Sequence, residues 1–180
     1  KDRLSQLTSD GNYSLWIATQ GSGIIRVNEN IVKKSSTLKA TEVIDHSTGL
    51  FDNYVMSIAY NNSLLWFGTW NSGLYNYNIS TKKVANAVID NNINKHLKAV
   101  AIIKILFIDA KTILVATRGN GIYIFDIKDD NSLVLKNQFN KESKQKIIND
   151  FITDVKVFNK NIWIASEGGI DVFDIKSNTV

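Results

Sequence analysis

Four residues of differing chemistry recur at nearly equal spacing along the chain: Gln20, Trp70, Arg118 and Glu167. Successive members are 50, 48 and 49 residues apart, so a repeated fold would place them at equivalent positions. An aromatic plate beside amide and charged groups can bind a sugar by stacking and hydrogen bonding. The alternative is that these positions vary freely, with Trp70 packed on a neighbouring loop and Arg118 paired with Glu167 or Asp109.

Residues that could support catalysis or metal binding are sparse in the rest of the chain. Neither His46 nor His96 has a partner at the spacing of metal ligands, and the chain contains no cysteine. The stretch Asp90–Lys95 is rich in side-chain oxygens. Because it lacks a glycine at its sixth position and a closing glutamate, we interpret it as a loop and not as a calcium site. We therefore expect a segment that is not an enzyme and that uses no cofactor and no metal ion.

The overall composition is that of a globular domain. Hydrophobic residues make up 44% of the 180 residues and charged residues 21%. The longest apolar run, Ala99–Ile108, is interrupted by Lys104 and is too short to cross a bilayer. The net charge of +4 comes from 18 lysines and 3 arginines that are spread along the chain. A nucleic-acid-binding surface usually concentrates such charge and favours arginine, so we expect neither nucleic-acid binding nor direct membrane contact.

The densest group of lysines comprises Lys136, Lys141, Lys144 and Lys146. Two acidic residues are mixed with them, which is typical of a solvated loop. A patch that binds an anionic ligand is the alternative interpretation.

The elements that must position the four recurring residues are themselves repeats. The four repeat segments are Leu15–Asn28, Leu65–Asn78, Ile113–Asp126 and Ile162–Asp174. Each begins with a β-branched and aromatic run that is apolar on both alternating faces, which predicts a strand buried between two sheets. A glycine-containing turn and a second apolar strand follow, so each segment predicts a hairpin with glycine at positive φ. A period near 49 residues with strand-type sequence is typical of β-propeller blades.

Further strand candidates flank each hairpin and complete four strands per blade. We predict an all-β fold over residues 1–180, with blades at about 4–46, 53–90, 99–140 and 150–180, the last without its outer strand. In this arrangement Trp16, Trp66 and Trp163 occupy the cores of their blades and are expected to pack there. Propellers close with about 4–8 blades. An incomplete last blade would leave sheet faces and edges open, so we expect this chain to belong to a larger propeller that supplies neighbouring blades.

The repeated pattern resembles the two-component regulator propeller repeat. The match is clearest from Leu65–Thr69 through Gly73-Leu74 to Tyr77-Asn78, and Gly49–Ile58 is similar to that family's lead-in to a blade. The third repeat departs from the pattern at Leu114, where the others have tryptophan, and the fourth turn is one residue shorter. The resemblance recurs four times and covers nearly the whole chain.

The resemblance implies a fold and a function. Such repeats form seven-bladed propellers in the periplasmic sensor regions of hybrid two-component histidine kinases, which commonly respond to polysaccharide fragments. It thus implies a periplasmic sensor segment that binds an oligosaccharide and alters the geometry of a homodimer. Two other classes stay open: a propeller used as a protein-interaction scaffold, and a polysaccharide lyase or hydrolase. An enzyme would need acids and bases that converge on the channel face, where the sequence offers Glu167 and Asp109.

Overall fold

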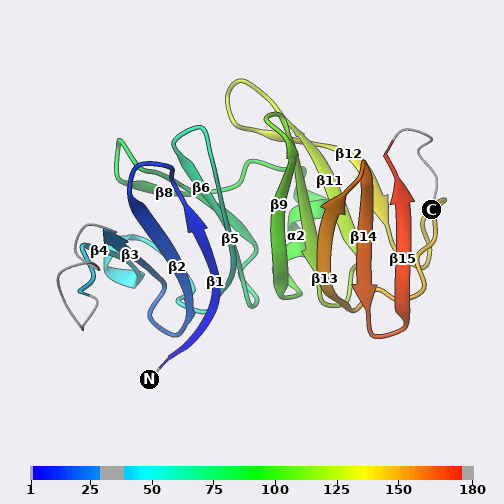
Figure 1. Cartoon of the computed structure of the whole chain (residues 1–180), viewed down its shortest axis with the longest axis horizontal. Coiled ribbons are helices and arrows are strands. Elements are labelled where there is room, and N and C mark those ends of the chain that lie inside the picture. The colour runs from blue at the N-terminus through cyan, green and yellow to red at the C-terminus, as the bar shows by residue number, and fades with distance from the viewer. Residues whose placement is uncertain (1, 29–38, 176–180) are drawn as a thin grey trace.

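Four antiparallel sheets follow one another along the chain (Figure 1). The computed structural model describes residues 2–28 and 39–175. The first sheet contains β1 (Arg3–Ser9), β2 (Ser14–Gln20), β3 (Ile24–Asn28) and β4 (Glu42–Ile44). The second contains β5 (Val55–Asn61), β6 (Leu64–Thr69), β7 (Leu74–Asn78) and β8 (Lys83–Asn86). The third contains β9 (Ile102–Asp109), β10 (Thr112–Thr117), β11 (Ile122–Ile127) and β12 (Leu133–Phe139). The fourth contains β13 (Ile152–Phe158), β14 (Asn161–Ser166) and β15 (Gly169–Asp174). We call these sheets blades 1 to 4.

The blades are arranged as in a propeller. Within each blade the strands pair in chain order, and the first strands of successive blades lie side by side: β1 packs against β5, β5 against β9 and β9 against β13. Among the described residues no comparable packing joins β13 of blade 4 to β1 of blade 1. The predicted all-β propeller fold is therefore confirmed, as an arc of four blades seen in Figure 1 from the side of the inner strands.

The second strands of the two inner blades, β6 and β10, pack against both neighbouring blades, as their two apolar faces predict. Trp16 and Ala18 of β2 lie in one core cluster with Leu65 and Phe67 of β6, between blades 1 and 2. The small residue two positions after the tryptophan makes room for the next blade. A β-carbon added to Gly68 would lie 2.3 Å from Cγ2 of Ile102, at the start of the next inner strand.

Trp163 departs from the predicted packing. The side chains of Trp16 and Trp66 are 0% and 1% exposed because the next blade covers them, whereas Trp163 is 42% exposed. It shares the outward face of blade 4 with Val172, its neighbour across the β14–β15 pair. No following blade covers this face among the described residues, so the expectation that Trp163 is a core residue is wrong for this stretch of chain.

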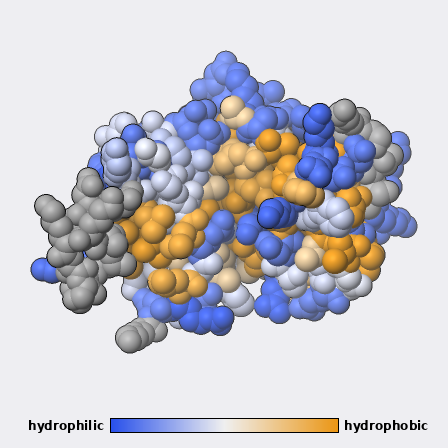
Figure 2. Space-filling view, viewed as in Figure 1, coloured by the Kyte–Doolittle hydropathy of each residue, from blue (hydrophilic) through white to orange (hydrophobic). Residues whose placement is uncertain are grey.

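The outward face of blade 1 is also apolar. Leu7, Ile17, Ile25 and Val43 lie opposite one another across β1 to β4, so they share one face of the sheet. Leu7 and Val43 are exposed. Figure 2 shows hydrophobic surface over the first blade on the left and over the fourth blade on the right. Both ends of the arc thus present apolar faces of the kind that meet inside it.

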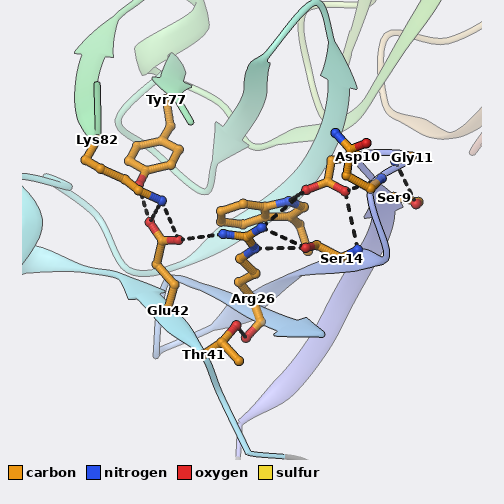
Figure 3. A network of polar contacts seen from close by, with 11 residues as sticks. Ser9, Asp10, Gly11, Ser14, Arg26, Thr41, Glu42, Tyr77 and Lys82 are labelled. Atoms are coloured by element: carbon orange, nitrogen blue, oxygen red, sulfur yellow. Dashed lines mark hydrogen bonds and ion pairs between the residues drawn. The ribbon is translucent and has the colours of Figure 1, made fainter. Parts of the chain in front are cut away.

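A buried polar network joins blades 1 and 2 at their outer side (Figure 3). The indole Nε1 of Trp16 donates a hydrogen bond to Oδ2 of Asp10 at 3.1 Å. The guanidinium of Arg26 lies 5.1 Å from the centre of the Trp16 ring and pairs with Glu42 at 3.3 Å. Because Asp10 and Trp16 are buried, these contacts satisfy polar groups that water cannot reach.

Glu42 connects this network to blade 2. Its carboxylate pairs with Nζ of Lys82 at 2.7 Å and accepts a hydrogen bond from the hydroxyl of Tyr77. Burial by itself raises the pKa of Glu42, but the hydrogen bonds, chiefly from Lys82 and Tyr77, outweigh burial and hold that pKa below its usual value. The charged form of Glu42 is therefore favoured by folding.

The lowered pKa of Glu42 predicts how the stability of the chain changes with pH. A carboxyl whose pKa is lower in the folded state stabilises the fold above its unfolded pKa of about 4.3, and the effect disappears as the pH falls through the folded pKa. At pH 7 we expect Glu42→Gln to lower the free energy of unfolding by about 1–2 kcal/mol, since Lys82 is half exposed. Urea denaturation at pH 7 and pH 3 should show the difference from wild type shrinking in acid, and a constant difference would contradict this role.

The segment from 90 to 98 is helical, where the sequence predicts a loop. Asp90 caps α2 (Asn91–Lys98) by accepting hydrogen bonds from the backbone amides of Asn92 and Ile93. Leu97 is fully buried in the core between blades 2 and 3. The loop interpretation rested on the polar side chains, but the N-cap and one buried face decide the local structure.

Candidate functional site

The turns that carry the four candidate residues are held by a repeated side-chain contact. In three blades a threonine lies at the end of the second strand or one residue before it, and its hydroxyl donates to a glycine carbonyl across the turn. The distances are 2.9 Å from Thr19 to Gly23, 3.1 Å from Thr69 to Gly73 and 2.8 Å from Thr117 to Gly121. The same hydroxyl accepts a backbone amide of the turn, so the residue that follows the threonine projects from a fixed position. This threonine contact was not predicted from the sequence, although the threonine recurs at the same repeat position in three blades.

The turns of blades 1 and 3 lie against the start of the next blade. The amides of Gly21 and Gly23 both donate to the carbonyl of Asn53, at 3.1 and 3.0 Å, and a single antiparallel bridge joins Gln20 to Tyr54. An equivalent bridge joins Arg118 to Phe151. The turns and the starts of the inner strands therefore share one face of the propeller, which we call the turn face.

A pocket on the turn face contains two of the four predicted residues. Gln20 and Trp70 line it together with Asp52, Tyr54 and Asn71, and its volume is about 510 Å³. We call it the Trp70 pocket. The side chains of Trp70 and Tyr54 are 47% and 55% exposed, so both rings are accessible to a ligand. An aromatic ring stacks on the apolar face of a sugar, and amide and carboxylate groups bind its hydroxyls.

One oxygen of the Asp52 carboxylate has no hydrogen-bond partner among the described residues. Oδ1 accepts the backbone amide of Tyr54 at 2.9 Å, whereas Oδ2 is buried and accepts no hydrogen bond from the described residues. Burial raises the pKa of Tyr75, and the nearby Asp52 carboxylate raises it further. The sequence offered no signal for Asp52 or Asn71, because neither lies at the repeated position.

Arg118 and Glu167 do not line the Trp70 pocket. The structure pairs them, with Nη2 of Arg118 3.1 Å from Oε1 of Glu167, and both side chains are about half exposed. This is one of the two pairings that the sequence left open for Arg118. The four predicted residues thus fall into two pairs, with Gln20 and Trp70 at one pocket and an ion pair between blades 3 and 4.

The described residues offer little for other chemistry. No group of three or more histidine or acidic side chains could hold a metal ion in the parts of the chain that the structure describes. Nδ1 of His46 lies 2.8 Å from the carbonyl of Leu50, a contact within the loop after β4. Glu167 follows β14 at the turn face, whereas Asp109 ends β9 at the opposite end of its blade. None of the described helices is long and apolar enough to cross a membrane.

Comparison with known sequences and structures places the chain by its fold. Neither a protein-family model nor a curated protein matches the sequence. The extracellular domain of BT3049 from B. thetaiotaomicron, assigned as a hybrid two-component system, matches with a TM-score of 0.73 and 20% identity over 99% of this chain. The extracellular domain of BT4673 from the same organism matches with a TM-score of 0.73 and 20% identity over 97% of this chain.

A third structure is PorZ, a surface component of the type-IX secretion system of Porphyromonas gingivalis. It matches with a TM-score of 0.74 and 16% identity over 96% of this chain. The chain spans 22% of each B. thetaiotaomicron structure and 26% of PorZ. Such low identities establish a shared fold and leave activity open. Over four blades, the chain therefore has the propeller fold of the extracellular domains of two-component systems.

Proposed function

We propose that this chain is a ligand-recognition segment of a periplasmic sensor propeller, which belongs to a hybrid two-component histidine kinase and responds to polysaccharide fragments. The Trp70 pocket carries the proposal, because two accessible aromatic rings and several hydrogen-bonding groups surround one cavity. The fold shared with the two-component extracellular domains supports the sensor class. The predicted partners are an oligosaccharide, neighbouring blades of the same protein and a second copy in a homodimer.

The Trp70 pocket also suggests how binding alters the propeller. Gln20 comes from blade 1 and Trp70 from blade 2, so a sugar that contacts both favours one packing of the two blades. A ligand shifts a conformational equilibrium only by its difference in affinity for the two states. The apolar end faces of the arc would pass that preference to adjoining blades and so to the geometry of the dimer.

Thermal denaturation with a panel of plant, host and microbial oligosaccharides tests the proposal. A ligand that binds only the folded chain stabilises it by about 2.7 kcal/mol at about 100 times its Kd, which raises Tm by several degrees. We expect one class of saccharide to raise Tm, and Trp70→Ala to abolish that shift. Trp163→Ala is the matched control, because Trp163 is similarly exposed and lies outside the pocket.

Two outcomes of the panel contradict parts of the proposal. A shift that survives in Trp70→Ala would keep the sensor function and move the site away from the Trp70 pocket. If no saccharide raises Tm, the proposal that the chain recognises a saccharide is wrong for the saccharides of this panel.

A protein-interaction scaffold is the second candidate. The apolar faces at both ends of the arc favour it, as does the shared fold with a secretion-system surface component. The enzyme alternative has less support, because its two candidate acids, Glu167 and Asp109, lie at opposite ends of their blades and Glu167 is paired with Arg118.

A further inference from the structure

A second and larger pocket lies between blades 3 and 4. Its volume is about 960 Å³, and it opens away from the turn face, beside Asp109 and Thr112 at the far end of blade 3. Ile124, Ile162 and Phe173 form part of its apolar lining. Three of the four clustered lysines also line it: Lys136, Lys144 and Lys146. We call it the lysine pocket.

At the interface that holds the lysine pocket, the third repeat has smaller side chains than the first repeat has at the same two positions. Between blades 1 and 2, Trp16 and its cross-strand neighbour Arg26 lie against each other, with Cζ of Arg26 5.1 Å from the centre of the Trp16 ring. In blade 3 the same two positions, again paired across the strands, hold Leu114 and Ile124. Smaller side chains at equivalent backbone positions leave a hollow unless the surroundings collapse. Leu114, which stands where the other repeats have tryptophan, packs in this interface.

The charges of the two interfaces also differ. Between blades 1 and 2, Glu42 of β4 lies opposite Arg26, and its carboxylate pairs with both Arg26 and Lys82. Arg26 also pairs with Asp10 at 3.8 Å, so two carboxylates balance the two cations. In blade 3 the residue opposite Ile124 is Asn137, which brings no negative charge.

Within the described residues, two of the three lysines that line this pocket lack such a carboxylate. Lys136 pairs with Asp126 at 3.2 Å, but neither Lys144 nor Lys146 forms an ion pair within the described residues. The one acid of the lining, Asp109, accepts the backbone amide of Lys111 at 2.8 Å. The pocket therefore has an excess of positive charge that an external anion would neutralise.

The loop that carries Lys144 and Lys146 is anchored. Ile147 is buried in the core between blades 3 and 4. Nδ2 of Asn137 donates to Oε1 of Gln145 at 2.9 Å, and the hydroxyl of Ser143 donates to the carbonyl of Gln145 at 2.7 Å. The two lysines thus flank a residue that is tied to β12, which reduces the cost of ordering them around a ligand.

From this geometry we infer that the lysine pocket is a binding site for an acidic saccharide. A carboxylate or sulfate group lies between Lys144 and Lys146, the side-chain amide of Gln138 binds a hydroxyl, and the carbon face of the sugar packs on Ile124 and Phe173. The inference rests on the proposed function in that the ligand is a saccharide. It adds a second site, on the opposite side of the arc from the Trp70 pocket. It also specifies that the ligand of this second site is negatively charged.

Isothermal titration calorimetry of the whole chain tests this site. The probes are a sulfated disaccharide, an unsulfated uronate disaccharide and a neutral disaccharide, each at low and high NaCl. We expect at least one acidic probe to bind, with an affinity that falls as salt rises, and the neutral probe not to bind at the lysine pocket. The sulfated and uronate probes distinguish the two sources of negative charge.

Variants identify the site. Lys144→Gln with Lys146→Gln should weaken acidic binding about tenfold or more while leaving Tm unchanged. Lys39→Gln with Lys83→Gln removes the same charge from exposed positions outside the pocket and should have little effect. An equal loss in both pairs of variants, or no acidic binding at all, would overturn the site. Acidic binding that Trp70→Ala abolishes and the Lys144 and Lys146 changes do not would overturn it while leaving the proposed function intact.

Discussion

Replacing Trp16 with alanine is expected to lower the free energy of unfolding by about 3–5 kcal/mol, the usual cost of truncating a buried tryptophan. The Trp16 side chain is 0% exposed, and its loss would also leave Asp10 and Arg26 without the indole that they contact. Urea denaturation of the wild type and the variant measures the difference.

Trp163→Ala is the matched comparison for this prediction. Trp163 holds the same repeat position in blade 4, but it is 42% exposed, so we expect a loss of no more than about 1–2 kcal/mol in this chain. In a longer protein that carries the next blade, the loss at Trp163 should approach that at Trp16. Equal losses at the two positions in this chain would contradict the view that the outward face of blade 4 is uncovered.

Replacing Gly121 with alanine is expected to have the second large effect, a loss of more than about 3 kcal/mol. Gly121 has φ +70°, and a β-carbon there would lie 2.0 Å from the backbone carbonyl oxygen of Phe139. Relief of this clash requires β12 to move away from the turn between β10 and β11, because a backbone atom cannot rotate aside.

Gly11→Ala separates the clash from the cost of the backbone conformation. Gly11 has a similar φ of +75°, but a β-carbon there would meet nothing within 4 Å. Its replacement should cost only the left-handed strain of about 1–2 kcal/mol. Thermal or urea denaturation of both variants measures the two losses, and similar values would show that the close approach at Gly121 is relieved by a small local shift.

The fold could be predicted because the interactions that form it repeat along the chain. Three features recur in the sequence: the alternating apolar strands, the small residue two positions after each tryptophan position, and the turn glycines. Each of them reflects a contact within a blade or between adjacent blades. Trp163 shows the limit of this reasoning. Its repeat position is identical to that of Trp16, and its exposure depends on whether a following blade is present.

Only part of the candidate site could be predicted in the same way. Gln20 and Trp70 were placed by the repeat, and they do line one pocket. Asp52 and Tyr54 lie on the loop and strand start that enter blade 2, and they reach the pocket through contacts between blades. The lysine pocket lies at the interface that contains Leu114 and Ile124. A sequence pattern identifies side chains, and it does not show the space that they leave between two blades.

Fluorescence of Trp70 tests the central claim, saccharide recognition at the Trp70 pocket, most directly. Trp16 and Trp66 are buried, so in a Trp163→Phe background Trp70 is the accessible tryptophan of the chain. Titration with the saccharide that raises Tm should produce a saturable blue shift of the emission, because a stacked sugar removes water from the indole. Unchanged emission at saccharide concentrations that stabilise the chain would contradict the claim and place the ligand elsewhere.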